Sequence, residues 1–320
     1  MKRIFKWLGI VLMVAIIGGV IVGWTPDTDP KEMRAKYTNA ASQFLDLGGG
    51  LSVHIRDEGK RDGPAILLVH GSNASLHTWE PWVARLGDTY RIISLDLPGH
   101  GLTGPNPTGD YHYKAYVDVV DRVATQLKAD RFTIGGNSMG GGVAWHYAVT
   151  HPDKVEGLVL VDAAGVPGWK SRKVPIGFRI ARMPVIKELA RIITPRSMIV
   201  KSLDTTLSNK AIIDDAMIDR YWELLRYPGN RKATLDRFAL VHNVESATKP
   251  VMSRIKAPTL ILWGAEDNLI PVSSGRWFAD AIPGSKLIIY PAIGHAPMEE
   301  AADQSAKDVR VWLEAQAKLR

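Results

Sequence analysis

The chain has 320 residues, of which 46% are apolar and 23% charged, a composition typical of a globular protein with one large core or two smaller ones. It contains no cysteine, which excludes a disulfide framework, a thiolate nucleophile, a cysteine zinc site and an acylated cysteine. The net charge is +7, but we find no nucleic-acid recognition motif and no basic stripe interleaved with aromatic residues, so we expect no nucleic-acid partner.

The first 25 residues have the pattern of a membrane-inserted segment. Trp7 to Trp24 is an 18-residue run without a charged side chain, and three basic residues precede it, Lys2, Arg3 and Lys6. About 20 residues of helix span a bilayer. A cleaved signal peptide is the rival interpretation, but the sequence before Pro26 offers no good small-x-small cleavage site.

We therefore predict a membrane anchor at residues 1–25 and a polar spacer at residues 26–42. Because basic residues favour the cytoplasmic side, the anchor would place the remaining chain on the extracytoplasmic side. The alternative is a secreted or periplasmic protein, released after signal cleavage.

From residue 43 onward, segments typical of strands and helices alternate. Two short strands flank Gly48 to Gly50, which indicates a hairpin. Continuous apolar runs then predict strands that are buried on both faces. These strands are expected at residues 65–69, 91–95, 132–135, 155–161, 258–264 and 286–290, with helices at 79–86, 113–127, 139–149 and 300–319. Such alternation predicts an α/β fold with a mostly parallel central sheet that is flanked by helices.

The alternation stops at about Val166. Residues 166–246 hold 15 Lys/Arg against 8 Asp/Glu, with helical patches and several prolines, and we interpret them as an inserted helical cap. The core would then comprise residues 43–165 and 247–320. Lys170 to Lys201 carries nine basic residues and one Glu among apolar side chains, which suits either a membrane-facing surface or a lid over a site with solvated charges. Three prolines favour a jointed lid: Pro175, Pro184 and Pro195.

The segment Gly136-Asn137-Ser138-Met139-Gly140 matches the pattern G-x-S-x-G between a predicted strand and a predicted helix. A serine on so sharp a turn is strained and exposed, and Gly136 and Gly140 let the two backbones pass without a Cβ clash. We therefore predict that Ser138 is a nucleophile.

A serine hydroxyl needs an imidazole to take its proton and a carboxylate to orient that imidazole. Asp267 and His295 follow the two last predicted strands, and the order Ser138, Asp267, His295 is that of nucleophile-elbow hydrolases. Asp162, directly after another strand, is the alternative acid. We expect Glu266 to be solvated.

Two other histidines at strand ends, His70 and His100, lie in glycine turns and are expected to shape the backbone, while Asp96 is expected to cap its own turn. A developing oxyanion requires backbone N–H donors that are fixed in advance. Met139, at the start of the helix, supplies one, and the loop after His70 supplies the second, with Ser72 as first choice and Asn73 as second.

With these residues in order, residues 43–319 resemble a serine hydrolase of the α/β-hydrolase fold, esterase-like or lipase-like, with a helical cap. The resemblance rests on His70-Gly71, on the segment from Asp96 to Gly101, on the elbow, on Asp267 and on Gly294-His295. A serine at position 138 argues against the haloalkane dehalogenases and epoxide hydrolases of the family, which use an aspartate there.

The elbow is also similar to that of hydrolases that cleave carbon–carbon bonds in aromatic ring-fission products. Those enzymes tend to have a glycine-rich oxyanion loop and a tryptophan just after the catalytic histidine, where this chain has Ser72-Asn73-Ala74 and Ala296-Pro297. The expected function is cleavage of carboxylic esters with apolar acyl or alcohol groups, through an acyl-enzyme. Carbon–carbon bond hydrolysis of a vinylogous diketone is the alternative function, and a non-enzymatic binding protein is a third hypothesis.

The predicted mechanism needs neither a metal nor an organic cofactor. The expected partners are a small apolar ester and, through the N-terminal helix and the basic part of the cap, a membrane. The sequence leaves the natural substrate and the oligomeric state open.

Overall fold

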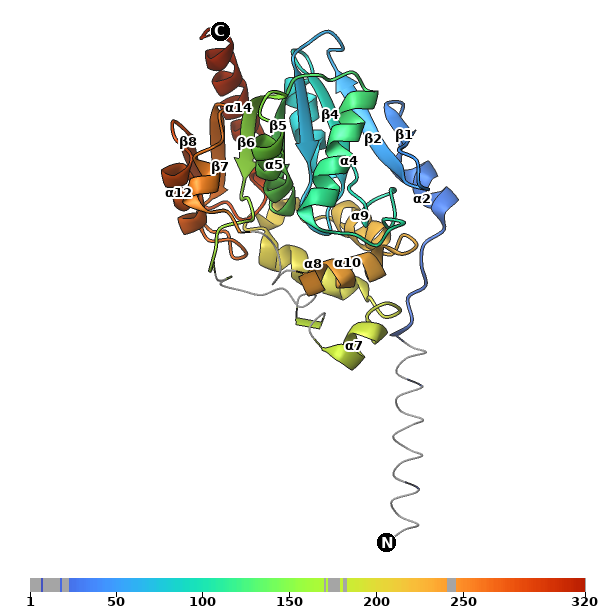
Figure 1. The fold of residues 1–320 in the computed structure, drawn as a ribbon. Coiled ribbons are helices and arrows are strands. Elements are labelled where there is room, and N and C mark those ends of the chain that lie inside the picture. The colour runs from blue at the N-terminus through green and yellow to red at the C-terminus, as the bar shows by residue number, and fades with distance from the viewer. Residues whose placement is uncertain are drawn as a thin grey trace.

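The structure, a computed structural model, describes residues 7, 18, 23–169, 171, 179–180, 183–240 and 246–319. Its centre is an eight-stranded sheet in the order β1-β2-β4-β3-β5-β6-β7-β8 (Figure 1). β1 pairs antiparallel with β2, and β2 antiparallel with β4, whereas all other neighbours are parallel. The predicted α/β fold with a mostly parallel sheet is confirmed.

The strands are β1 (Ser42–Asp46), β2 (Ser52–Gly59), β3 (Ala65–Val69), β4 (Arg91–Leu95), β5 (Phe132–Asn137), β6 (Val155–Val161), β7 (Thr259–Gly264) and β8 (Lys286–Tyr290). The helices outside the predicted cap are α2 (Pro30–Tyr37), η1 (Leu76–Trp79), α3 (Glu80–Leu86), α4 (Tyr113–Gln126), α5 (Met139–Thr150), α11 (Lys249–Met252), α12 (Val272–Ala281), α13 (Pro297–Glu300) and α14 (Ala302–Ala317). Within the predicted cap they are α7 (Pro184–Leu189), α8 (Arg196–Thr206), η2 (Lys210–Ile212), α9 (Asp215–Leu225) and α10 (Asn230–Leu240).

The middle strands are apolar on both sides because helices cover both faces of the sheet. In β3, Leu67 belongs to a core cluster shared with α4, α5 and α12, while Ile66 and Leu68 belong to a second cluster shared with α3 and α14. All three side chains are at most 1% exposed. Successive side chains of a strand point to opposite faces, so an unbroken apolar run is what a twice-covered strand requires.

The predicted membrane anchor is corrected by the structure. Crossing a bilayer takes about 20 apolar residues of continuous helix. Within the described ranges, no helix is both long and apolar enough to span a membrane, and the longest of them, α14, has 16 residues. Most of residues 1–22, on which the prediction rested, lie outside the described residues. The extracytoplasmic localisation that was derived from the anchor is wrong on this finding. A membrane partner bound through the N-terminal helix is not supported by the described residues.

The residues expected to form a polar spacer instead contain helix α2, which Asp29 caps through hydrogen bonds to the N–H groups of Lys31 and Glu32. The chain just before α2 packs against the predicted cap. Thr25 N–H donates to the carbonyl of Ile192 (2.8 Å), and Arg231 of α10 pairs with Asp27 (2.6 Å).

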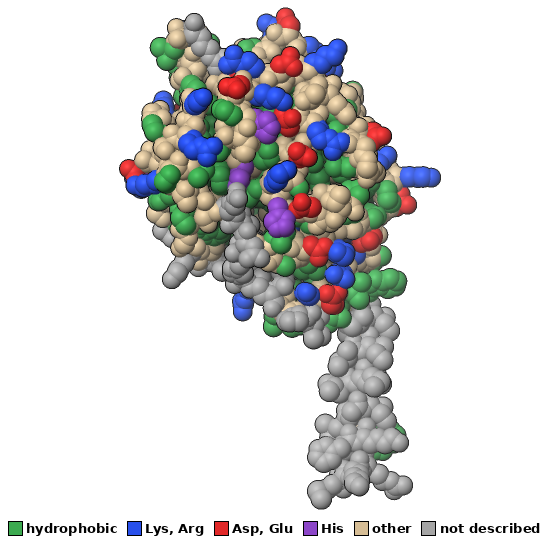
Figure 2. Space-filling view, viewed as in Figure 1, with side chains coloured by type: hydrophobic (Ala, Val, Ile, Leu, Met, Phe, Trp, Pro, Cys, Tyr) green, Lys and Arg blue, Asp and Glu red, His purple; other side chains and the backbone are tan. Residues whose placement is uncertain are grey.

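Helices α7 to α10 lie together at one end of the sheet (Figure 1). Several of their basic residues are paired with acids, as in Arg196 with Asp215 and Asp219, both at 2.6 Å. Basic and acidic side chains are interspersed on the face shown in Figure 2. Much of the predicted basic stretch, residues 170, 172–178 and 181–182, lies outside the described residues. The boundaries of the cap stay a prediction.

Helices α3 and α14 are joined by Trp82, which is fully buried and donates its indole N–H to Ser305 Oγ (2.9 Å). We expect Trp82→Ala to lower the free energy of unfolding by about 3–5 kcal/mol, because a large buried side chain leaves a cavity. Urea denaturation measures the change. Val311→Ala, on the exposed side of α14, should change it by about 0.5 kcal/mol or less. A loss below about 1 kcal/mol for Trp82→Ala would contradict this assignment of the core.

Candidate active site

Ser138 stands at the turn between β5 and α5, with φ 54° and ψ −119°. This region of backbone conformation is strained for a residue with a side chain. The glycines on either side have no room for a Cβ atom. At Gly136 it would lie 2.2 Å from the carbonyl oxygen of Gly140, and at Gly140 it would lie 2.1 Å from that of Val69. Close backbone contact therefore holds the serine at the end of the sheet.

The structure brings Asp267 and His295 together. The imidazole Nδ1 of His295 lies 2.6 Å from Oδ2 of Asp267, and both side chains are buried. The other carboxylate oxygen of Asp267 accepts the N–H groups of Leu269 (2.7 Å) and Ile270 (3.0 Å). With its carboxylate fixed in this way, Asp267 can hold the ring of His295 in one orientation. Glu266 is exposed, as expected.

Contacts of the residues next to Ser138 show that it lies in the same region. The amide of Asn137 donates to the carbonyl of His295 (3.0 Å), and a Cβ atom placed on Gly71 would lie 3.2 Å from Cβ of Ser138. Among the described residues no hydrogen bond joins Ser138 Oγ to His295. Such catalytic hydrogen bonds are often long outside the transition-state complex.

Neither of the two N–H groups that were predicted to bind an oxyanion has an acceptor among the described residues. Met139 is the first residue of α5, so its N–H has no partner within the helix. Ser72 N–H makes no hydrogen bond to any described residue. His70 steadies this loop, since its Nδ1–H donates to the carbonyl of Gly71 (2.7 Å) and its Nε2 accepts Leu97 N–H (3.0 Å). Burial lowers the pKa of His70, which keeps the ring in this neutral form.

Asp162, the alternative acid, lies beside Asp267, but it is Asp267 that makes the hydrogen bond to His295. One ligand atom from each of Asp162, Asp267 and His295 lies within 4.8 Å of the others. Oδ1 of Asp162 accepts Gly264 N–H (3.0 Å), whereas Oδ2 has no hydrogen-bond donor. Burial, and then the charge of Asp267, raises the pKa of Asp162 well above its usual value. A protonated Asp162 resolves the contact, because it can donate its proton to the carboxylate of Asp267.

Glu300 is a residue that the sequence analysis missed. Its Oε2 accepts the N–H groups of Gly294 (3.1 Å), Ser208 (2.7 Å) and Asn209 (2.9 Å), and its Oε1 accepts that of Ala296 (3.1 Å). One buried carboxylate thus fixes the loop of His295 and ties it to the predicted cap. An acid at the end of the helical turn just after the histidine loop was the available signal.

A second serine, histidine and aspartate also meet in the fold. His54 lies 2.7 Å from Asp96 and 3.1 Å from Ser42 Oγ. Asp96 also accepts Leu102 N–H (2.9 Å), so it caps its turn as expected. Burial alone would raise its pKa, but the hydrogen bond from His54 and the neighbouring histidines hold the pKa of Asp96 below its usual range. Ser42 is the first residue of β1, not of an elbow.

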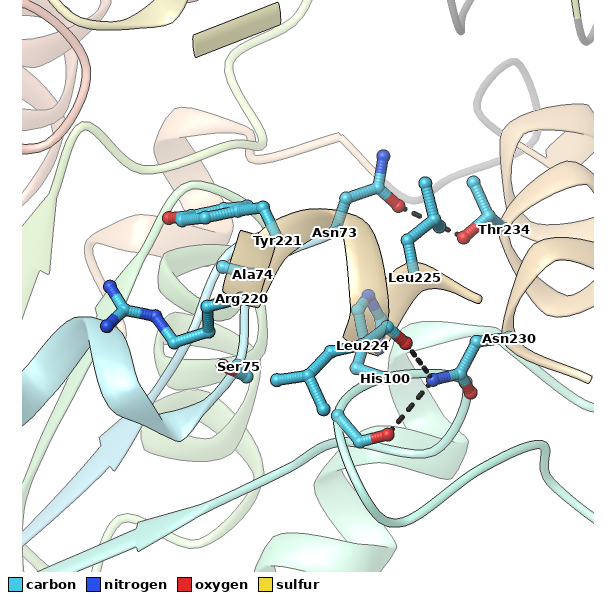
Figure 3. A pocket seen from close by; sticks show the side chains of 12 residues that line it. Asn73, Ala74, Ser75, His100, Arg220, Tyr221, Leu224, Leu225, Asn230 and Thr234 are labelled. Atoms are coloured by element: carbon cyan, nitrogen blue, oxygen red, sulfur yellow. Dashed lines mark hydrogen bonds between the residues drawn. The ribbon is translucent and has the colours of Figure 1, made fainter. Parts of the chain in front are cut away.

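His100 is likewise buried, with Nδ1 3.2 Å from the carbonyl of Pro98. It lines a pocket between the loop Asn73–Ser75 and helices α9 and α10 (Figure 3). Ser138, Asp267 and His295 do not line this pocket.

Comparison with known proteins agrees with this arrangement. Residues 64–302 match the family described as α/β hydrolase fold. The chain belongs to this family. The fold of the family is the one described above, in which Ser138 follows β5, Asp267 follows β7 and His295 follows β8.

Among similar proteins is Lipase 1 of Psychrobacter immobilis, 26% identical over 85% of this chain and 84% of that protein. Another is 2-hydroxymuconate semialdehyde hydrolase of Pseudomonas sp. strain CF600, 26% identical over 83% of this chain and 92% of that protein. A crystal structure described as a membrane phospholipase A, a bacterial virulence factor, superimposes with a TM-score of 0.76 at 26% identity, covering 99% of both chains. The family thus includes hydrolases of different substrates.

The raised pKa of Asp162 leads to a pH-dependent prediction. Between the unfolded pKa, about 3.9, and the higher folded pKa, the native protein binds more protons, so its stability falls as pH rises through that interval. Asp162→Asn does not titrate. We therefore expect its stability relative to the wild type to improve by up to about 1.4 kcal/mol per pH unit while Asp162 stays protonated in the native wild type.

Urea denaturation of both proteins between pH 5 and pH 8 measures this difference. The exposed substitution Asp130→Asn is the control and should show no such slope. A stability difference that stays constant over this range would mean that Asp162 is ionised in the native protein.

Proposed function

We propose that this hydrolase is a serine esterase that cleaves carboxylic esters of apolar acyl or alcohol groups. The observation that carries the proposal is the strained turn at Ser138, located where the Asp267–His295 pair and two unpaired backbone N–H groups also lie. A nucleophile, a base with its orienting acid, and an oxyanion site are the parts that acyl transfer needs.

In the proposed reaction Ser138 Oγ attacks the ester carbonyl as Nε2 of His295 takes its proton. Asp267, hydrogen-bonded to Nδ1, stabilises the imidazolium that forms. The N–H groups of Ser72 and Met139 bind the oxyanion. His295 then gives the proton to the leaving alcohol, and afterwards activates the water that releases the acid and restores Ser138.

The proposed preference for apolar groups rests on the composition of residues 166–246, which are rich in Ile, Leu and Met. The likeness to Lipase 1 of Psychrobacter immobilis supports an ester substrate.

Carbon–carbon bond hydrolysis by the same residues is the second candidate. The likeness to 2-hydroxymuconate semialdehyde hydrolase favours it. The residues after His70 and after His295 favour the ester, because this chain has Ser72 and Ala296 where the carbon–carbon hydrolases tend to have a glycine and a tryptophan. Faster turnover of a vinylogous diketone than of any simple ester would support the second candidate.

The test is hydrolysis of p-nitrophenyl esters from acetyl to palmitoyl. We expect Ser138→Ala to lower kcat by about 10³-fold or more, because the nucleophile is lost. Ser42→Ala removes the serine of the second Ser–His–Asp contact and serves as the matched control, with kcat within about twofold of the wild type. If Ser138→Ala stayed active, or if a folded wild type left every ester intact, the esterase proposal would fail.

A further inference from the structure

Arg237, on helix α10 of the predicted cap, is a buried cation without an acidic partner. Its side chain is 5% exposed, and within the described part of the chain no Asp or Glu forms an ion pair with it. The titratable groups near its charge are the hydroxyls of Tyr116 and Tyr111 and the imidazoles of His70 and His100, none of which is an acid paired with it. One guanidinium nitrogen, Nη1, has no hydrogen-bond acceptor. A buried charge is costly unless it is paired, so this arrangement calls for an explanation.

The guanidinium donates to the loop that carries the proposed oxyanion donor. Nη2 lies 3.0 Å from Ser72 Oγ and 2.8 Å from Asn73 Oδ1, and Nε lies 3.3 Å from Ser72 Oγ. The amide oxygen of Asn73 also accepts the hydroxyl of Thr234, one turn earlier on α10, at 3.0 Å (Figure 3). Both residues of the loop are therefore held by one face of a cap helix.

This loop needs such support because its backbone is strained. Asn73 has φ 60°, in the left-handed region, and the turn from Gly71 to Ala74 is closed by a long backbone hydrogen bond of 3.3 Å. On the core side His70 fixes the carbonyl of Gly71. The loop at Ser72 is thus held from both sides, while Ser72 N–H has no acceptor among the described residues.

We propose that Arg237 is a positioning residue for the oxyanion site, which holds Ser72 and Asn73 in place and adds a positive charge beside the developing negative charge. Among the described residues this charge has no counter-ion, and the oxyanion of the transition state would supply one. Preorganised charge in a dry site contributes to catalysis because little reorganisation is needed when the reaction occurs. The inference rests on the proposed function.

A charged group on the substrate is a less suitable partner for Arg237. The unpaired Nη1 is buried, and it faces Gly99, where a Cβ atom would lie 3.6 Å away. The neighbouring pocket in Figure 3 is lined by Asn73 and Thr234 but not by Arg237. The guanidinium is therefore buried and does not line this pocket.

The test compares Arg237→Gln, which keeps a hydrogen-bond donor without the charge, with Arg237→Lys, which keeps the charge. Arg231→Met is the matched control, because Arg231 lies on the same helix, is equally buried at 6% exposed, and contacts Thr25 and Asp27 and not the loop. The readouts are the rate of phosphonylation of Ser138 by a p-nitrophenyl alkylphosphonate, and kcat and KM for the best p-nitrophenyl ester.

We expect Arg237→Gln to lower the phosphonylation rate and kcat by about 10- to 100-fold. This loss is somewhat smaller than that caused by removing a direct oxyanion donor. KM should change by less than about twofold. Arg237→Lys should recover most of that loss, and Arg231→Met should stay within about twofold of the wild type. Thr234→Val removes the second donor to Asn73 and a long contact (3.4 Å) with Arg237 Nη2, and leaves the charge in place. It is the variant to compare if Arg237→Gln does not fold, and it should lower kcat by about two- to fivefold.

If the folded Arg237→Gln or Thr234→Val variant reacted at the wild-type rate, or lost activity only through a raised KM, the inference would be overturned. Equal losses for Arg237→Lys and Arg237→Gln would overturn the role of the charge. A wild type that is not phosphonylated at Ser138 would instead defeat the proposed function itself, so the two failures are distinguishable.

Discussion

The close crossing of β3, β5 and α5 is the constraint on which the site depends. At Gly140 a Cβ atom would lie 2.1 Å from the carbonyl oxygen of Val69 and 2.5 Å from that of His70. Only a glycine lets the start of α5 approach the end of β3 this closely. The approach places Ser138 beside the loop after His70, so the nucleophile and one proposed oxyanion donor are positioned by the same backbone contact.

Buried carboxyl groups organise the other side of the site. Glu300 gathers four backbone N–H groups from the loop of His295 and from the predicted cap, and Asp162 joins the ends of β6 and β7 through Gly264 N–H. Buried polar groups are stable only when their hydrogen bonds are made. These carboxyl groups therefore act as fixed supports for Asp267 and His295, which they restrain without taking part in the proposed proton transfer.

The predicted cap contacts both sides of the site. Thr206 at the end of α8 accepts the backbone N–H of His295 (3.0 Å), and Arg237 of α10 donates to Ser72. A movement of these helices would shift the proposed base and a proposed oxyanion donor together. Similar proteins include a lipase and a 2-hydroxymuconate semialdehyde hydrolase, so the fold by itself does not identify the substrate.

Local sequence determined much of this protein. Continuous apolar runs predicted the central strands, because a strand covered on both faces needs apolar side chains at every position. The pattern around Ser138 and the order of Asp267 and His295 predicted the candidate site, because each lies in the loop that follows a strand and parallel strands bring their ends together. The anchor was predicted from the same kind of local signal, an apolar run, but no described helix is long and apolar enough to span a membrane, and the localisation derived from the anchor is wrong.

Only the tertiary structure decided the partners of the buried charges. Arg237 and Ser72 are 165 residues apart, and Glu300 and Ser208 are 92 apart, so no window of sequence contains both members of either contact. Asp162 was recognised from its place after a strand, but the rise of its pKa follows from its own burial and then from the charge of Asp267 beside it, which only the packing of the strands brings about. Sequence periodicity reports which face of an element is covered, whereas hydrogen bonds between loops depend on how the elements pack.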